Sequence, residues 1–283
     1  MAKRNTRPTD FKEALARVPW TSRGRDTPIS RLARSIVPVG NQASVPKGDA
    51  SLHMAIQDEA HEHIGLDIQG TAFQAGRGKL YTCWHVIEAL RFQEREAYLL
   101  ANTRLNGVPA QRPYPFAAIA KYYDMRFEDG GPGIDAGILI CPATETPEFP
   151  YEVPPVTWGD STRVGVGDRV LIGGFPLGRQ MFFANSTNRG LIQPSFFDGI
   201  ISAIIPAIRP GETRLFQISS VALNGISGGV VCDPRTGVVL GMVTSGLTSG
   251  EIDLPITYAL PSEVLRPFAD AISFDVGDSE PWK

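Results

Sequence analysis

The feature of this sequence that most restricts its fold is Ser227, a serine set among glycines just before an apolar segment. Residues 224–230 read Asn-Gly-Ile-Ser-Gly-Gly-Val. A hydroxyl is a poor nucleophile unless a base removes its proton and the site stabilises the oxyanion that forms. Neighbouring glycines allow a sharp turn that points backbone N–H groups at such an oxyanion. The run therefore indicates a serine presented on a tight turn.

Chain order narrows the classes of serine site that are possible. All four histidines precede Ser227, and they are His53, His61, His63 and His85. In α/β-hydrolases the same Gly-x-Ser-x-Gly pattern is followed by the acid and then the histidine, so that class is excluded. The subtilisin order stays formally open, because Asp49, Asp58 and Asp67 precede His85. The strand-rich pattern argues against that α/β architecture, which leaves the order His, Asp, Ser.

His85 and Asp135 are the candidate base and acid. His85 follows the apolar segment 79–84 and precedes a short helical turn at 88–90, so we expect it at the end of a strand. Asp135 opens the apolar segment 135–141. A carboxylate in such a position is partly desolvated and needs a partner, which an imidazole N–H would supply. Each residue alone could have a structural role, but together with Ser227 they indicate a catalytic triad.

The chain resembles the bacterial trypsin-like serine peptidases, and its pattern is most similar to the protease domain of the HtrA/Deg group. The resemblance covers residues 33–272. The motifs that carry it lie at 70–73, 80–86, 134–139, 166–178, 225–229, 237–244 and 258–262. The resemblance implies an all-β fold of two antiparallel six-stranded β-barrels with a C-terminal helix. It also implies a serine endopeptidase without a trailing peptide-binding domain, a metal or another cofactor.

The resemblance further implies a role for individual residues. His85 and Asp135 would come from the first barrel and Ser227 from the second. Backbone N–H groups of Gly225 and Ser227 would form the oxyanion hole, which binds the negatively charged oxygen of the reaction intermediate. The strand edge at Thr244, Ser245 and Gly246 would pair with the substrate, and Val221 would form the floor of its side-chain pocket. An apolar floor favours cleavage after small or medium apolar residues over Lys or Arg.

The sequence departs from the family pattern at three positions. Trp84 stands where a small residue is usual, so the wall beside His85 is expected to be reshaped. Val230 replaces a proline after the Ser-Gly-Gly motif, which is a minor packing change. Ile226 replaces the polar or acidic residue that usually precedes the serine. Activation by a salt bridge between that acid and a newly cut N-terminus is therefore not expected here.

We divide the 283 residues into a basic N-terminal arm (1–32), a first barrel (33–150), a second barrel (151–275) and a tail (276–283). Proline-rich residues 142–155 are the expected linker between barrels. A closing helix is expected over 262–271. Strands are expected near 36–39, 67–75, 79–84, 97–101, 116–123 and 135–141, and near 168–174, 187–192, 199–205, 214–219, 229–233, 237–244 and 256–260.

An insertion at residues 40–65 separates the first two expected strands. It holds His53, His61 and His63 with Asp58, Glu59 and Glu62. A His-x-His pair can chelate a metal ion, but this spacing fits no standard ligand set. We therefore favour an amphipathic surface helix over a metal site.

Cysteine usage and the N-terminus bear on the compartment. Cys83, Cys141 and Cys232 all lie in apolar segments, where buried free thiols are expected. Disulfides of the secreted trypsins have no counterpart near His85 or Ser227, which favours a reducing compartment. Residues 1–22 contain no long apolar stretch of the kind a signal peptide needs. The expected location is the bacterial cytoplasm.

Charge is unevenly distributed along the chain. Residues 1–35 carry nine Lys/Arg and three Asp/Glu, a net charge of +6, while the whole chain carries −3 and the remainder therefore −9. Such an arm is expected to be solvated, and it could also dock a regulatory protein with an acidic surface. Nucleic acid and membrane are not expected as partners.

Two further function classes stay open at this stage. The same fold can serve as a catalytically quiet binding or scaffolding module, which the matching contexts of His85, Asp135 and Ser227 make the weaker hypothesis. The same machinery also cleaves activated esters, so an esterase is the second alternative. What gates the activity is open as well, since an unregulated protease would be hazardous to a cell.

Overall fold

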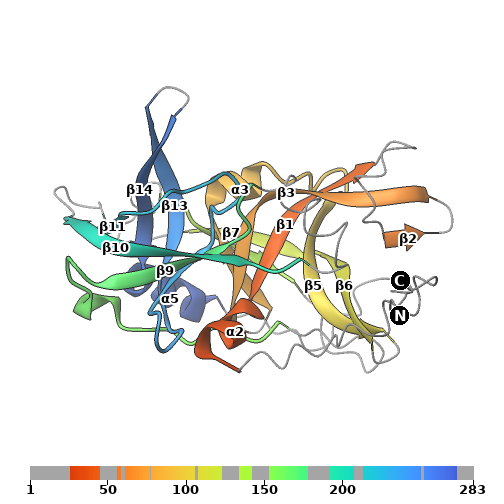
Figure 1. The fold of residues 1–283 in the computed structure, drawn as a ribbon. Helices are drawn as coiled ribbons and strands as arrows, with labels where there is room; N and C mark the ends of the chain where they lie inside the picture. Colours follow the sequence, from red (N-terminus) through yellow and green to blue (C-terminus); the bar gives the residue numbers. More distant parts are fainter. Residues whose placement is uncertain are drawn as a thin grey trace, which may run out of the picture.

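The computed structural model describes residues 26–44, 56–58, 61–76, 78–105, 108–122, 134–141, 153–177, 192–206, 213–249 and 252–272. Its strands form two antiparallel assemblies, one from each half of the chain (Figure 1). The basic arm expected at residues 1–32 is described only from residue 26. The first helix or strand in the described part is α2 (Pro28–Ala33). None of the described helices is long and apolar enough to cross a membrane.

The first half is a curled eight-stranded sheet. Its strands lie in the order β6-β5-β1-β3-β4-β8-β7, with β2 paired to β3. A short helix, α3 (Trp84–Glu88), follows β4 and lies between the two halves (Figure 1). The strands are β1 (Ile36–Ser44), β2 (Ile56–Asp58), β3 (His61–Gly76), β4 (Lys79–Thr82), β5 (Ala97–Leu105), β6 (Val108–Pro115), β7 (Ala118–Lys121) and β8 (Gly137–Ile140).

The second half is a closed six-stranded barrel in the order β10-β11-β14-β13-β12-β9. Its strands are β9 (Arg169–Gly174), β10 (Ser195–Ile205), β11 (Leu215–Ile218), β12 (Val230–Cys232), β13 (Val239–Ser249) and β14 (Ile252–Pro261). The all-β prediction is therefore confirmed, and the closed barrel lies in the half that holds Ser227. Within the described residues, β6 and β7 stay unpaired with each other, so the first sheet curls without closing.

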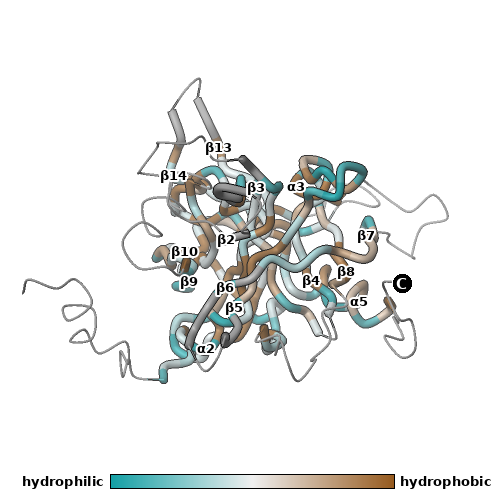
Figure 2. Tube along the Cα trace, turned by 90° about the vertical axis from the view of Figure 1, so that its right-hand side faces the viewer, coloured by the Kyte–Doolittle hydropathy of each residue, from teal (hydrophilic) through white to brown (hydrophobic). Residues whose placement is uncertain are grey.

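Alternating burial explains why these segments form strands. In β10 the residues Gly199 and Ile201 are buried and Asp198 and Ile200 are exposed, the period expected of a sheet with one face in a core. All four residues of β8 are buried, because this strand is covered on both faces. Hydrophobic segments gather along the inner strands, and hydrophilic ones lie in the outer turns (Figure 2).

The C-terminal helix α5 (Ser262–Ala271) follows the last strand of the barrel and fastens it to the first sheet. The hydroxyl of Tyr81 in β4 donates to the carbonyl of Leu265 in α5 at 2.5 Å. The Lys79 ammonium donates to the carbonyls of Ala269 and Ile272 at the end of the helix. The two Lys79 bonds satisfy carbonyls of the kind that a helix C-terminus leaves without partners.

The structure corrects the interpretation of residues 40–65. The expected surface helix is wrong for the described part of this segment, because β1 extends to Ser44, β2 covers 56–58 and β3 begins at His61. The sequence from Ile64 to Ile68 alternates apolar and polar residues, which is the period of a strand. The side chains of His53, His61 and His63 lie outside the described part, as do most of the expected strand 187–192 and most of the linker 142–155.

Candidate active site

The imidazole of His85 and the carboxylate of Asp135 are in direct contact. His85 Nδ1 lies 2.7 Å from Asp135 Oδ2, and the backbone N–H of His85 donates to Oδ1 of the same carboxylate at 3.0 Å. His85 lies in the first turn of α3 rather than at a strand end, because β4 stops at Thr82. Asp135 precedes β8, which pairs with β4, so the two side chains meet at one end of neighbouring strands.

This contact shifts both groups toward their charged forms. The hydrogen bond that the His85 ring donates to Asp135 raises the pKa of His85, although partial burial of the ring opposes the shift, and the charges of Asp135 and Glu88 add to it. Burial alone would raise the pKa of Asp135. Hydrogen bonds from the His85 ring and from the backbone N–H groups of His85 and Trp84 outweigh burial, so the pKa is lowered. Asp135 is therefore an ionised partner for a base that takes up a proton.

Ser227 lies on the tight turn that its glycines predict. Gly225 and Gly228 have φ angles of 89° and 82°, the left-handed region that glycine adopts readily. Backbone bonds close the turn, from Ile226 N–H to Leu223 O at 3.1 Å and from Gly229 N–H to Ile226 O at 2.8 Å. Ile226 is buried in the core of the barrel, which explains the apolar residue before the serine.

The serine turn lies against the first sheet, close to His85. The backbone N–H of Thr71 in β3 donates to the carbonyl of Ser227 at 2.9 Å. Gly70 allows this close approach because it has no side chain. A Cβ at its position would lie 2.6 Å from Val86, the neighbour of His85, and 3.1 Å from the Ser227 carbonyl oxygen. The fold thus brings all three residues of the expected triad to the same seam between the halves.

The Ser227 hydroxyl makes a different hydrogen bond from the one expected. It donates to the carbonyl of Thr244 at 3.4 Å, and within the described part of the chain no hydrogen bond joins it to the His85 ring. Catalytic hydrogen bonds are often long or misaligned in an unliganded site and form fully only with substrate.

The backbone N–H groups of Gly225 and Ser227 have no acceptor within the described residues. Those of Ile226, Gly228 and Gly229 all donate, and Gly228 donates to the carbonyl of Val243 at 2.9 Å. Gly225 and Ser227 are half-buried, and theirs are the amides expected in the oxyanion hole. Donors without a partner at the surface of a site are available to an incoming acceptor.

The residues expected to contact substrate lie in β13 and in the loop that connects β11 to the Ser227 turn. Thr244, Ser245 and Gly246 lie in β13, where Ser245 and Gly246 pair on one side with β14. β12 pairs with the earlier part of β13, up to Met242, so within the described residues no strand pairs with the other side of Ser245 and Gly246, which are exposed, whereas Thr244 is buried. Val221 is 36% exposed beside it. A Cβ on Gly246 would lie 2.9 Å from Ala222 Cβ, so the space between these segments is narrow.

Two residues of the site were not singled out by sequence reasoning. The thiol of Cys83 donates to the carbonyl of Val243 at 3.1 Å, directly behind the His85–Asp135 pair. Thr71 contacts the serine turn from the opposite half. Both lie in motifs that carry the family resemblance, but their contacts depend on how two distant strands approach each other.

Cys83, His85 and Asp135 are also the one group among the described residues whose ligand atoms could hold a metal, since these atoms lie within 4.8 Å of one another. Metal ligation requires a thiolate. Cys83 is fully buried, and burial followed by the nearby Asp135 charge raises the pKa of its thiol well above the ordinary value. The arrangement favours a proton-bearing thiol. Cys141 and Cys232 are likewise buried and form no disulfide among the described residues, as expected.

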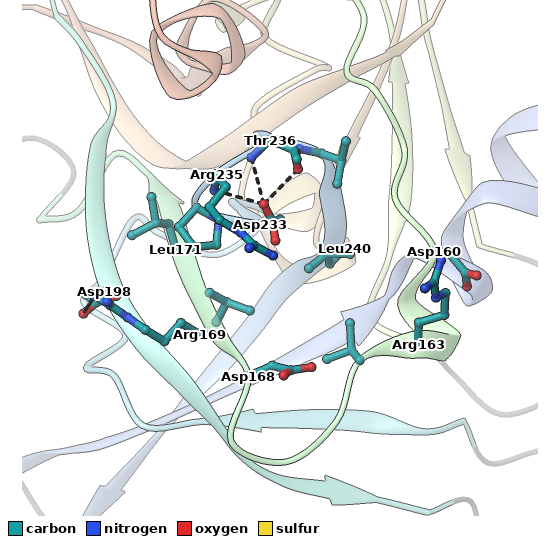
Figure 3. Close-up of a pocket in the computed structure, with 14 residues that line it drawn as sticks. Asp160, Arg163, Asp168, Arg169, Leu171, Asp198, Asp233, Arg235, Thr236 and Leu240 are labelled. Carbon is teal, nitrogen blue, oxygen red and sulfur yellow. Dashed lines mark hydrogen bonds and ion pairs between the residues drawn. The ribbon is translucent and has the colours of Figure 1, made fainter.

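A separate hollow on the second barrel has different properties (Figure 3). It has a volume of about 940 Å³ and contains none of the residues expected in the site. Its carboxylates already have partners: Asp168 accepts from Gly165 N–H, Asp198 pairs with Arg169, and Asp233 accepts from the backbone of its own turn. The hollow therefore offers no reactive group of its own.

Comparison with known proteins assigns the class. A sequence profile described as the trypsin-like peptidase domain matches residues 70–242, a span that includes His85, Asp135 and Ser227. The matched span is more than half of the chain, so the chain belongs to the family of trypsin-like peptidase domains. No curated protein sequence matches the chain closely enough to count as a relative.

Solved structures agree on the fold. The HtrA-type protease AlgW with decapeptide is 18% identical, with a TM-score of 0.56, and the match covers 86% of this chain and 66% of that one. An inactive form of Rv3671c from M. tuberculosis H37Rv, with a serine-to-alanine mutation, is 16% identical, with a TM-score of 0.50 and coverage of 92% and 94%. This chain thus spans about two thirds of the length of AlgW. At these identities the likeness concerns the fold alone.

Proposed function

We propose that the chain is a serine endopeptidase that cleaves peptide bonds with Ser227, His85 and Asp135. The observation that carries the proposal is the 2.7 Å contact between His85 Nδ1 and Asp135 Oδ2, formed beside a serine on a glycine turn. With Nδ1–H held by Asp135, the other ring nitrogen is free to accept a proton.

In the proposed reaction Ser227 Oγ attacks the carbonyl carbon of the substrate while Nε2 of His85 takes the hydroxyl proton. The carbonyl oxygen becomes an oxyanion and accepts hydrogen bonds from the N–H groups of Gly225 and Ser227. When the C–N bond breaks, His85 gives its proton to the leaving amine, and an ester to Ser227 remains. Water, deprotonated by His85, then attacks this ester and releases the new carboxyl terminus and the Ser227 hydroxyl.

The proposed substrate is a polypeptide in extended form, paired with the uncovered edge of β13 from Thr244 to Gly246. The AlgW structures with decapeptide and tripeptide support a peptide as the ligand class. The apolar Val221 and the narrow space between Gly246 and Ala222 support a small or medium apolar side chain before the cleaved bond.

The test is labelling with a fluorophosphonate, which reacts only with an activated serine. We expect the native chain and Ser202→Ala to be labelled and Ser227→Ala to be unlabelled, because Ser202 lies in β10 and is bonded to Gln217. Equal labelling of native chain and Ser227→Ala would refute the assignment. Labelling together with cleavage in a peptide library supports the endopeptidase. Labelling with ester turnover alone indicates an esterase, and no labelling indicates a binding module.

A further inference from the structure

Thr71 is a buried threonine of β3 in the first sheet, yet most of its polar contacts are with the second barrel. Its exposed fraction is 0%. Its hydroxyl donates to the carbonyl of Gly225 at 2.8 Å and accepts from the backbone N–H of Phe175 at 2.9 Å. Its own backbone N–H donates to the carbonyl of Ser227 at 2.9 Å. One residue of the first half thus contacts the nucleophile turn at two carbonyls.

The direction of these bonds is fixed by chemistry. A hydroxyl has a single hydrogen, and a backbone N–H can only donate, so the Thr71 proton must point to Gly225. Both of its partners would lose their bond if the hydroxyl were replaced by a methyl group. Burial makes that loss costly, because water cannot take the place of the missing partner.

The surrounding glycines show how closely Thr71 is packed. A Cβ on Gly174 would lie 2.9 Å from the Thr71 hydroxyl oxygen. A Cβ on Gly228 would lie 2.1 Å from the Thr71 carbonyl oxygen, a distance that no side chain tolerates. The nucleophile turn therefore reaches Thr71 only because its residue after the serine is glycine.

The two carbonyls held by Thr71 lie on either side of the peptide plane that carries the Ser227 N–H. Each carbonyl is part of a rigid peptide plane, so fixing the oxygen fixes that plane. Thr71 holds the plane after Gly225 and the plane after Ser227, and the plane that carries the Ser227 N–H lies between them. The Gly225 N–H is on the plane just before the first of these. The middle plane is itself held by the bond from the Gly229 N–H to the Ile226 carbonyl at 2.8 Å, so the Ser227 amide lies in a segment fixed at three successive carbonyls, two of them by Thr71.

We propose that Thr71 is a positioning residue for the oxyanion hole, through which the first sheet holds the nucleophile turn of the second barrel in its reactive conformation. This inference rests on the proposed function. It assigns to Thr71 no contact with substrate, and it predicts that loss of the hydroxyl weakens binding of the transition state rather than of the substrate.

The experiment compares Thr71→Val with Thr71→Ser and with Thr82→Val. Valine has nearly the shape of threonine without the hydroxyl, and serine restores the hydroxyl. Thr82→Val is the matched control, because Thr82 is equally buried and its hydroxyl donates to the carbonyl of Thr71 at 2.7 Å but makes no hydrogen bond to the nucleophile turn. All four proteins are compared in thermal stability, kcat, KM and affinity for a peptide boronate, which forms a tetrahedral adduct with the serine.

We expect Thr71→Val to lose roughly 10- to 100-fold in kcat with KM changed less than about twofold, and to lose affinity for the boronate by a similar factor. Thr71→Ser should recover most of the loss. Thr82→Val should lose stability with little change in kcat. A Thr71→Val variant that folds and keeps its native kcat and boronate affinity would overturn the inference. So would an equal loss of kcat in the two valine variants.

Hydrogen exchange separates this inference from the proposed function. Deuterium uptake by residues 223–230 should rise in Thr71→Val and stay at the native level in Thr71→Ser. If no protein reacts with a fluorophosphonate but the exchange follows this pattern, the proposed function fails and the role of Thr71 in holding the turn stands. If the proteins are active and exchange and kcat are the same in all of them, the role of Thr71 is wrong and the proposed function stands.

Discussion

The two halves of the candidate site differ in how fully they are assembled. On the first sheet the His85–Asp135 pair is complete, with two hydrogen bonds between ring, backbone and carboxylate. On the second barrel the Ser227 hydroxyl is bonded to the carbonyl of Thr244, and within the described residues the amides of Gly225 and Ser227 have no acceptor. In the proposed mechanism the acid–base pair is thus formed before substrate arrives, while the nucleophile and the proposed oxyanion hole still lack their partner.

This difference follows from what each half must do in the proposed reaction. An imidazole that exchanges protons needs a fixed orientation and a fixed tautomer, which a carboxylate provides through a short hydrogen bond. An oxyanion hole must leave its donors unpaired, because a donor already bonded within the protein would have to lose that bond during the reaction. The half with the His85–Asp135 pair (the assembled half) and the half with Ser227 (the waiting half) therefore meet two different requirements. Substitutions in each half should have different consequences.

The largest effect is expected from Asp135→Asn, which breaks the assembled half. An amide can hold the ring in the wrong tautomer, with its proton on the nitrogen that should accept the serine proton. We expect kcat to fall about 10³- to 10⁴-fold while the fold is retained. Steady-state kinetics and circular dichroism would measure both. The control is Asp198→Asn, which removes a surface carboxylate paired with Arg169, and its kcat should stay native. Ordinary turnover of Asp135→Asn would remove Asp135 from the mechanism.

An intermediate effect is expected from Gly225→Ala, which disturbs the waiting half. Alanine strains a backbone with a φ angle of 89°, and relief of this strain would turn the Gly225 amide away from the site. We expect a loss of about 10²-fold in kcat with His85 and Asp135 undisturbed. Gly167→Ala is the matched control, because Gly167 has a φ angle of 97° with open space around it. Comparable losses of stability, with activity lost only in Gly225→Ala, are the expected result. Equal activity of the two variants would show that the turn does not depend on Gly225.

Much of the second barrel could be predicted from its sequence, because its strands are either short apolar runs, as in β12, or segments with alternating burial, as in β11. The helix expected over 262–271 coincides with α5, and the strands expected at 168–174 and 199–205 overlap β9 and β10. The candidate triad could also be predicted, since the chain has few histidines and His85 is in the expected context. The contact between His85 and Asp135 is what the structure adds.

The first sheet was harder to predict, because its unusual features depend on tertiary position. β6 contains Pro109, Pro113 and Pro115 and was not expected to be a strand, yet it pairs with β5 along its length. It lies at the edge of the sheet, where a residue without an N–H is tolerated. The contacts of Thr71 with Gly225 and Ser227 could not be predicted either, since they join residues about 150 positions apart.

The smallest effect is expected from Glu88→Gln, which changes the charge near the assembled half without breaking it. The hydrogen bond that His85 donates to Asp135 raises the pKa of His85 against the effect of burial, and the charges of Asp135 and Glu88 add to the rise. The base must be neutral to accept the serine proton, so kcat/KM should fall as the pH drops through this raised pKa. The acid limb of the pH profile should therefore lie above the pKa of a free histidine.

Glu88→Gln keeps a side-chain oxygen that can accept from the Trp84 indole N–H, which donates to Glu88 at 2.6 Å. Only the negative charge is lost, so the acid limb should move to slightly lower pH while the plateau of kcat/KM stays the same. Glu94→Gln is the control, since Glu94 is paired with Arg91 and is not among the groups that shift His85. An acid limb that moves upward in Glu88→Gln, or that moves equally in both variants, would mean that the limb reports a group other than His85. The assembled half of the site would then need a base other than His85.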